Sequence, residues 1–226
     1  MKSGKPAAAQ SRVLIVEDHP ITREGLAYLI NRQPGMTVCG HAEAAPQALE
    51  VLKSSKPDLV IVDLTLPGKS GLELIKDIKA LHPGLPVFVI SMHEESLYAE
   101  RVLRAGARGY ITKEAGGEKV IEAIRQVLRG HIYVSNSVSA RILEIFTRGQ
   151  SERKRSSIEQ LSDREFEIFE LIGTGLSSRR IADRLHLSAK TVDTHRASIK
   201  KKLNFKTTSE LISYAARWAA GRGNNG

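Results

Sequence analysis

Short apolar runs alternate with amphipathic segments along the first 130 residues of the chain. The runs 12–17, 58–63 and 86–91 are nearly continuous in apolar residues, which is typical of strands covered on both faces. Two shorter extended runs, 36–40 and 109–112, complete a series of five strand-then-helix units. This alternation predicts an α/β fold with a five-stranded, doubly wound parallel sheet.

The pattern changes after residue 130. One further amphipathic segment, which we expect to form a linker helix, is followed by the polar run 150–157, which contains no apolar residue and indicates an exposed linker. Only helical patterns with short connections come after it, as in a compact helical bundle. We therefore predict an α/β domain, a linker and an all-helical domain, at residues 11–130, 131–157 and 158–226.

The composition excludes several classes of protein. The 226 residues include one cysteine, Cys39, so no internal disulfide can form, and a reduced cytoplasmic setting is expected. No run approaches the roughly 18 apolar residues of a membrane span, and the N-terminus lacks the apolar segment of a signal peptide. We predict a cytoplasmic protein without a membrane partner.

The net charge of +9 is unevenly distributed. Residues 151–226 carry 15 Lys and Arg against 9 Asp and Glu, whereas the first 150 residues carry 19 against 16. The basic excess in the last third indicates a polyanionic partner. An ordinary solvated surface explains the charge equally well on these numbers alone.

Charged and hydroxyl residues end the predicted strands at the sheet edge where doubly wound folds bind ligands. Glu17 and Asp18 follow the first strand, Asp63 the third, Ser91 the fourth, and Lys113 the fifth. Neighbouring carboxylates repel one another, and a hard cation such as Mg²⁺ relieves that repulsion through oxygen ligands. The set suits a carboxylate nucleophile that takes a phosphoryl group, with Asp63 as the candidate.

Each of these residues also has a plainer interpretation. A strand-end acid often caps the next helix, Ser91 suits a turn, Tyr110 suits the core, and Lys113 suits the surface. The joint occurrence at the ends of the right strands is what favours a site.

Four motifs in this region resemble the receiver domain of bacterial two-component response regulators. They occur in order over about residues 11–130 and read VLIVEDHPITREGL, DLVIVDLTLPGKSGLEL, VFVISMHEE and GARGYITKEA. The resemblance implies that Asp63 is phosphorylated by a sensor histidine kinase. It implies a Mg²⁺ site made by Glu17, Asp18, Asp63 and the backbone carbonyl of Thr65.

The same resemblance assigns three further roles. Ser91 would hold the phosphoryl oxygens, Tyr110 would change rotamer, and Lys113 would pair with the phosphate. One departure is Glu114, which stands after Lys113 where many receivers have a proline preceded by a cis peptide bond.

In the basic C-terminal part, two helical patterns separated by HLSAK predict a helix–turn–helix. Ser188 can cap the second helix, and Val192 and Ile199 should face inward because they lie seven residues apart. The candidate contacts with bases and phosphates are Lys190, Thr191, Asp193, Thr194, His195, Arg196, Lys200 and Lys201, with Lys202 following. A charged helix on a solvated face is the alternative.

Residues 160–220 resemble the LuxR-type DNA-binding domain of NarL/FixJ response regulators, through LSDREFEIFELI, IADRLHLSAKTVDTHRASIKKKL and TSELISYA. The resemblance implies that the helix 189–202 reads the major groove of double-stranded DNA. It implies a homodimer through the last helix, about 208–220, with Leu211, Ile212, Tyr214, Ala215 and Trp218 as its candidate face. Asp193 would be unfavourable beside a phosphate.

Together these patterns predict a phosphorylation-dependent transcription regulator, not an enzyme. An aspartate-nucleophile phosphohydrolase with a basic accessory domain is one alternative. Enzymes that resemble the haloacid dehalogenase type have a second Asp two residues after the nucleophile, where this chain has Thr65. The other alternative is a DNA-binding regulator that works without phosphorylation, although the presence of Asp63, Ser91 and Lys113 argues against it.

Overall fold

The computed structural model describes residues 10–147 and 157–221. The chain divides into two compact units, with the boundary between residues 144 and 145. Nearly all of the predicted polar linker, residues 150–157, lies outside the described residues. Among the described residues, no helix has both the length and the apolar character needed to cross a membrane.

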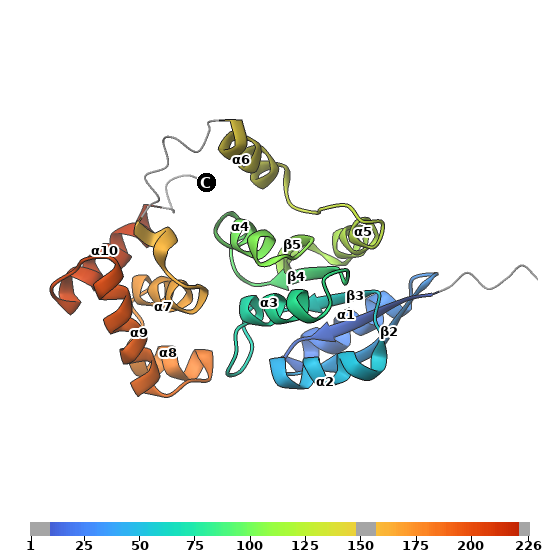
Figure 1. Ribbon diagram of the computed structural model, residues 1–226, viewed down its shortest axis with the longest axis horizontal. Coiled ribbons are helices and arrows are strands. Elements are labelled where there is room, and N and C mark those ends of the chain that lie inside the picture. The colour runs from blue at the N-terminus through green and yellow to red at the C-terminus, as the bar shows by residue number, and fades with distance from the viewer. Residues whose placement is uncertain (1–9, 148–156, 222–226) are drawn as a thin grey trace, which may run out of the picture. The chain divides into compact units, whose positions relative to one another are not determined.

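The first unit alternates strands and helices (Figure 1). Its elements are β1 (Ser11–Val16), α1 (Pro20–Asn31), β2 (Met36–Ala42), α2 (Ala45–Ser55), β3 (Leu59–Val62), α3 (Gly71–Leu81), β4 (Val87–Ser91), α4 (Glu95–Ala105), β5 (Gly109–Thr112), the 3₁₀ turn η1 (Lys113–Ala115) and α5 (Gly117–Leu128). Helix α6 (Asn136–Thr147) follows and contains the boundary to the second unit. All four strand pairs are parallel, in the order β2-β1-β3-β4-β5. The predicted five-stranded, doubly wound parallel sheet is confirmed.

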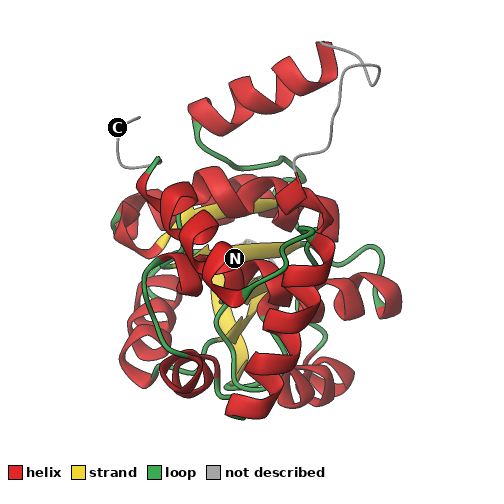
Figure 2. Cartoon of the chain, turned by 90° about the vertical axis from the view of Figure 1, so that its left-hand side faces the viewer, coloured by secondary structure: helices red, strands yellow, loops and turns green. Residues whose placement is uncertain are grey.

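Helices cover both faces of this sheet (Figure 2). Val13 and Ile15 of β1 belong to a core shared with α1 and α5, where Ile30 and Ile124 are fully buried. Successive side chains of a strand point to opposite faces of the sheet. Leu14 and Val16 of β1 are equally buried and therefore face the helices on the other side of the sheet. Burial on both faces explains why the strands are apolar without interruption.

The strand order places the site. The chain turns in opposite directions from β1 and from β3, so these two neighbouring strands form the point at which the winding reverses. The loops after their carboxyl ends diverge there and leave room for a ligand. Glu17 and Asp63 are the first residues after these two strands.

The second unit is helical in its described part. Its elements are η3 (Ser157–Gln160), α7 (Asp163–Gly173), α8 (Ser178–Leu185), α9 (Ala189–Lys202) and α10 (Thr208–Ala220). Its core includes Ile168, Phe169 and Ile181, together with Val192 and Ile199, which are fully buried as predicted. The Ser162 and Ser188 hydroxyls accept hydrogen bonds from the first-turn amides of α7 and α9, which fixes where both helices begin.

Candidate functional site

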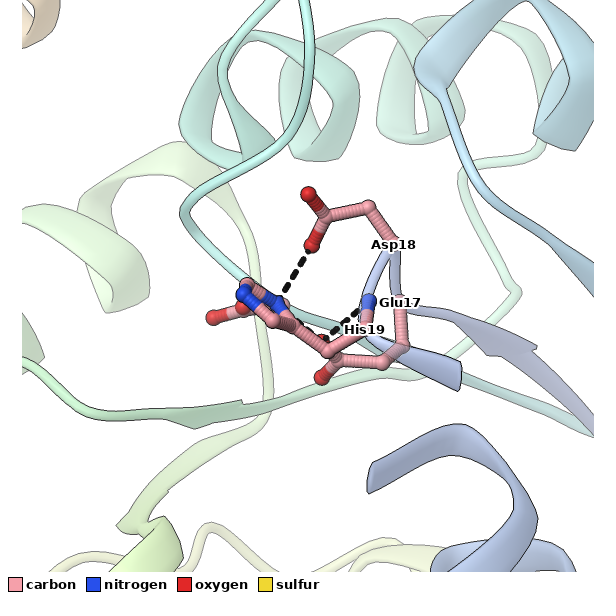
Figure 3. A group of neighbouring side chains, drawn as sticks. Glu17, Asp18 and His19 are labelled. Atoms are coloured by element: carbon pink, nitrogen blue, oxygen red, sulfur yellow. Dashed lines mark hydrogen bonds and ion pairs between the residues drawn. The ribbon is translucent and has the colours of Figure 1, made fainter. Parts of the chain in front are cut away.

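Three carboxylates and an imidazole meet at the carboxyl ends of β1 and β3. The ligand atoms of Glu17, Asp18, His19 and Asp63 all lie within 4.8 Å of one another (Figure 3). Glu17 and Asp63 are only 1% and 4% exposed, so their charges are largely removed from water. Such a group is electrostatically costly unless a cation stands against it.

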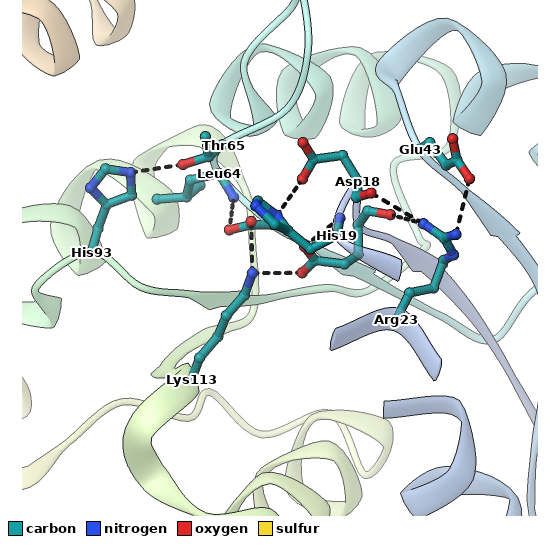
Figure 4. A network of polar contacts seen from close by, with 10 residues as sticks. Asp18, His19, Arg23, Glu43, Leu64, Thr65, His93 and Lys113 are labelled. Atoms are coloured by element: carbon teal, nitrogen blue, oxygen red, sulfur yellow. Dashed lines mark hydrogen bonds and ion pairs between the residues drawn. The ribbon is translucent and has the colours of Figure 1, made fainter. Parts of the chain in front are cut away.

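Lys113 supplies one such cation from the start of η1, directly after β5. Its Nζ lies 2.6 Å from Glu17 Oε2 and 2.8 Å from Asp63 Oδ2 (Figure 4). Burial alone would lower the pKa of Lys113, but the charges and hydrogen bonds of Asp63 and Glu17 outweigh it and raise that pKa. Lys113 is therefore held in its charged form between the two acids.

Glu17 experiences the opposite balance. Burial raises its pKa first, the nearby charge of Asp63 raises it further, and the contacts with Lys113 only partly offset these effects. The Glu17 carboxylate is thus less stable as an anion here than it is in water. The three carboxylates of the cluster offer oxygen ligands, which a hard divalent cation prefers.

The loop after β3 holds the Asp63 carboxylate in a fixed orientation. The Leu64 amide donates to Asp63 Oδ1 over 2.7 Å, and the Gly71 amide donates to the Leu64 carbonyl over 2.9 Å. A Cβ at Gly71 would lie 2.1 Å from the backbone oxygen of Asp63, well inside contact distance. Only glycine lets the first residue of α3 approach the loop this closely.

Two residues of this site were not predicted from the sequence. Arg23 of α1 donates to the Glu17 carbonyl over 2.9 Å and pairs with Glu43 over 3.0 Å, so it ties down the backbone of the acidic pair. His19 Nδ1 lies 2.8 Å from Asp18 Oδ1 and 3.2 Å from Glu17 Oε1. A basic residue one turn into a helix that follows two acids is the signal that could have pointed to Arg23.

The remaining predicted receiver residues lie at the ends of β4 and β5. Ser91 and Tyr110 are fully buried, and the Tyr110 hydroxyl donates to the His93 carbonyl over 2.7 Å. The Ser91 hydroxyl accepts from the His93 amide over 3.4 Å. Thr65 Oγ1 lies 3.1 Å from His93 Nε2 (Figure 4). His93 is therefore a third residue that the sequence did not reveal.

The peptide bond after Lys113 is trans, unlike the cis bond that precedes proline at this point in many receivers. All peptide bonds in the described residues are trans, including the one that joins Lys113 to Glu114. A non-proline cis bond costs roughly 3 kcal/mol, and Glu114 gives no proline to reduce that cost.

In the second unit, α9 carries the predicted DNA contacts. Lys190, Asp193, Thr194 and Lys201 are exposed, and Thr191, His195, Arg196 and Lys200 are partly exposed. Lys202, which follows these residues, has its Nζ 2.6 Å from Glu165 Oε2 of α7, and its contact with phosphate stays a prediction. Lys202 therefore joins α9 to α7 within the unit.

Glu165 of α7 accepts the hydrogen bonds that hold α9 against α7. Burial would raise the pKa of Glu165, but hydrogen bonds from Lys202, Ser198 and Ser162 lower it to about 2. The Ser198 hydroxyl donates over 2.5 Å and the Ser162 amide over 2.7 Å. The carboxylate thus caps α7 and binds α9 at the same time.

Asp193 has a partner within the protein. The Ser178 hydroxyl of α8 donates to Asp193 Oδ1 over 2.7 Å and accepts from Arg196 Nη1 over 2.6 Å. This chain of hydrogen bonds connects α8 to α9 and holds the guanidinium of Arg196. The negative charge of Asp193 is therefore placed to orient Arg196.

The predicted dimer face is partly incorrect. Leu211 and Ala215 are 1% and 0% exposed, because they pack into the core of their own unit. Tyr214 and Trp218 are half-buried and pack on Phe169, with ring centroids 6.0 and 5.1 Å apart. Ile212 is 41% exposed and is the apolar member of the set that remains on the surface.

Comparison with known proteins identifies the family. The model described as the response regulator receiver domain matches residues 13–125. The model described as bacterial regulatory proteins, luxR family, matches residues 159–215. The chain therefore belongs to the two-component response regulators that combine a receiver domain with a LuxR-type helix–turn–helix domain, a family of DNA-binding transcription regulators.

Individual relatives extend over nearly the whole chain. The oxygen regulatory protein NreC of Staphylococcus carnosus is 34% identical over 210 residues, which cover 91% of this chain and 97% of that protein. The response regulator GacA of Pseudomonas aeruginosa is 35% identical over 207 residues, which cover 91% of this chain and 95% of that protein.

Solved structures give the same result. A two-component response regulator of the LuxR family from Aurantimonas sp. matches with a TM-score of 0.57 at 34% identity, covering 62% of this chain and 99% of that one. RcsB from Salmonella enterica serovar Typhimurium, solved bound to promoter rprA in the presence of the phosphomimetic BeF₃⁻, matches with a TM-score of 0.60 at 25% identity, covering 92% and 98%.

Proposed function

We propose that this chain is a phosphorylation-dependent transcription regulator of the cytoplasm, in which Asp63 accepts a phosphoryl group from a sensor histidine kinase. The observation that carries the proposal is the buried Asp63 carboxylate, held between Lys113 Nζ at 2.8 Å and the Leu64 amide at 2.7 Å beside two further acids. The two family domains in one chain support the link from this chemistry to DNA.

In the proposed reaction, a carboxylate oxygen of Asp63 attacks phosphorus and forms a new P–O bond. The P–N bond to the kinase histidine breaks, and its electron pair returns to the imidazole. Lys113 stays protonated and offsets the charge on the transferred oxygens, while the Ser91 hydroxyl donates a hydrogen bond to one of them. The Tyr110 side chain then changes rotamer and transmits the phosphorylation of Asp63 to the outer surface of the receiver unit.

A Mg²⁺ ion fits the donor set of this site. Glu17, Asp18, Asp63 and the Thr65 carbonyl would hold it, and it would neutralise charge on the phosphoryl group when bound. Arg23 contributes by fixing the backbone of the two acids that precede α1. Burial, together with the nearby charge of Asp63, raises the pKa of Glu17, and a bound cation would offset this cost of its anionic form.

For the output, we propose that α9 enters the major groove of promoter DNA. Arg196 is held in place through Ser178, and the partly exposed Lys200 and the exposed Lys201 are available to phosphates. The solved complex of the relative RcsB with a promoter supports this mode of action. We propose that two copies pair through the exposed part of α10, which includes Ile212.

Treatment of the full chain with acetyl phosphate and Mg²⁺ tests the first step by intact-mass measurement. We expect a mass increase of one phosphoryl group, which Asp63→Asn abolishes. Continuous release of phosphate over many turnovers would instead indicate a phosphohydrolase. An unchanged mass in the wild-type chain would contradict the proposal and favour a regulator that works without phosphorylation.

Genome-wide DNA occupancy tests the second step. Occupied sites should gain occupancy in cells that express the wild-type chain and can phosphorylate it, and lose that gain with Asp63→Asn. Sites whose occupancy is identical for the two proteins would contradict control by phosphorylation while leaving DNA binding itself intact.

A further inference from the structure

His93 stands where the loop after β3, the end of β4, helix α4 and strand β5 meet. It lies in the three-residue connection between β4 and α4, and its side chain and backbone both make contacts. Its imidazole Nε2 lies 3.1 Å from Thr65 Oγ1, and its ring packs on the ring of Tyr98 with centroids 4.4 Å apart. Its carbonyl accepts the Tyr110 hydroxyl over 2.7 Å.

Each of these contacts leads to a different part of the receiver unit. Thr65 is two residues beyond Asp63, so its hydroxyl moves with the loop that carries the phosphoacceptor. Tyr98 is a fully buried residue of α4 and therefore moves with that helix. Tyr110 is a fully buried residue of β5. One residue thus connects the loop beside the reaction to the two elements of the α4–β5 face.

We propose that His93 is a positioning residue that transmits the state of the Asp63 loop to α4 and β5, through its side-chain hydrogen bond with Thr65. The inference rests on the proposed function, because it needs a reaction at Asp63 to transmit. Phosphorylation adds charged oxygens beside residues 63–65, and a change in the position of Thr65 changes the hydrogen bond that fixes the imidazole. The imidazole and the carbonyl that holds Tyr110 belong to the same residue.

A neutral hydrogen bond of this kind has a modest net value, corresponding to about a two- to tenfold change in an equilibrium constant. A two-state switch responds to a difference of this size, because a ligand shifts an equilibrium only by its differential interaction with the two states. Loss of the bond should therefore reduce the response of the α4–β5 face by about two- to tenfold and leave the reaction at Asp63 in place.

His93→Phe is the informative variant. Phenylalanine keeps a ring that can pack on Tyr98 and keeps the backbone carbonyl for Tyr110, but it removes the nitrogen that meets Thr65. His93→Gln is the conservative variant, because its amide can still reach the Thr65 hydroxyl. Thr65→Val removes the same bond from the other side. His41→Phe, at an exposed position of the edge strand β2, controls for the loss of a histidine.

The experiment measures backbone hydrogen exchange in the full chain, with and without acetyl phosphate and Mg²⁺, in peptides that cover residues 95–112. Variants are compared at equal extents of Asp63 phosphorylation, read by intact mass in the same samples. In the wild type and in His41→Phe, the phosphodonor should change the exchange rates of these peptides. His93→Phe and Thr65→Val should each lose most of that change, and His93→Gln should retain it.

The double variant Thr65→Val with His93→Phe sharpens the test. If one hydrogen bond carries the effect, the double variant should lose no more of the response than either single variant. Losses that simply add would mean that the two residues act separately, and would overturn the inference.

Two further outcomes would overturn it and separate it from the proposed function. If His93→Phe responds like the wild type, His93 does not transmit the state, although the proposed function stands. If His93→Phe is folded but takes no phosphoryl group, His93 acts in the phosphorylation reaction and not in its transmission. A wild-type chain that is not phosphorylated would contradict the proposed function and, with it, this inference.

Discussion

The two units of this chain handle charge in opposite ways. In the receiver unit Glu17 and Asp63 are almost completely buried, and Lys113 pairs with both of them at the edge of the sheet. In the helical unit the candidate DNA contacts are exposed or partly exposed along α9, and the ion pair of the buried Glu165 with the exposed Lys202 joins α9 to α7. A reaction needs fixed groups in low dielectric, whereas a large anionic partner needs accessible ones.

The comparison also separates two kinds of carboxylate. Burial and the neighbouring Asp63 raise the pKa of Glu17, whereas hydrogen bonds from Lys202 and Ser198 lower the pKa of Glu165 to about 2 against burial. The first carboxylate is destabilised as an anion and is suited to binding a cation. The second is stabilised as an anion and is suited to structure. Substitutions should therefore act in opposite directions at the two sites.

The largest expected effect comes from Lys113→Met. This change leaves Glu17 and Asp63 buried beside each other without their counter-charge, and we expect it to destabilise the receiver unit by about 3 kcal/mol in a chelating buffer. Mg²⁺ should recover part of the loss. Urea unfolding followed by circular dichroism measures both. Lys53→Met, in an exposed pair with Glu50, should change little, and an equal effect of the two variants would contradict the comparison.

The second effect is that of Glu165→Gln on the helical unit. Because the folded pKa of Glu165 is depressed, its charge stabilises the fold above its ordinary value of 4.5, and this stabilisation is lost as pH falls toward about 2. We expect a loss of about 1–3 kcal/mol at pH 7 that shrinks across this window. Fluorescence of Trp218, the one tryptophan of the chain, reports unfolding of this unit.

Asp183→Asn, at an exposed position of α8, is the matched control for Glu165→Gln. Its stability difference from the wild type at pH 7 should be small, because its side chain is exposed. A Glu165→Gln variant that behaves in the same way would show that the joint between α7 and α9 does not depend on this charge.

The third effect separates three adjacent lysines. Lys200→Ala and Lys201→Ala should each weaken binding to double-stranded DNA and make the dependence of log affinity on log salt shallower by about 0.9. Lys202→Ala should leave that slope unchanged and lower the stability reported by Trp218, because its ammonium binds Glu165. Salt titrations with one DNA fragment measure the slopes. Equal slopes for all three variants would mean that the ion pair opens on DNA.

The smallest effect is expected from Glu17→Gln. A raised folded pKa means that ionisation of Glu17 costs stability, and that this cost is absent below its ordinary value of 4.5 and complete above the folded pKa. The neutral variant should therefore be more stable than the wild type at pH 7, by about 0.5–1 kcal/mol, and should bind Mg²⁺ more weakly. A gain that persists below pH 4 would have another cause.

The sheet and the meeting of the acids were predictable for one reason. Parallel strands bring their carboxyl ends to one edge, so residues 46 positions apart such as Glu17 and Asp63 are placed together by topology alone. Lys113 follows by the same argument from β5. Uninterrupted apolar runs in the sequence identify the strands that are covered on both faces.

Other features depend on tertiary contacts that no local pattern encodes. The apolar positions of a helix look alike whether they pack into their own unit, as Leu211 and Ala215 do, or onto a second copy. Three consecutive lysines cannot be distinguished in the sequence, although one of them, Lys202, forms an ion pair with Glu165 in the structure. His93 acts through the hydroxyl of Thr65, 28 residues away, and such a partner leaves no signature in the order of residues.

Gly71 sets a limit for anyone who redesigns this receiver. Gly71, the first residue of α3, lies so close to the main chain at Asp63 that even one methyl group would find no space. A library that randomises the loop to retune kinase preference should therefore leave this codon fixed. Clones with another residue at this position should be inactive because the backbone at Asp63 is displaced, although their reacting side chains are unchanged.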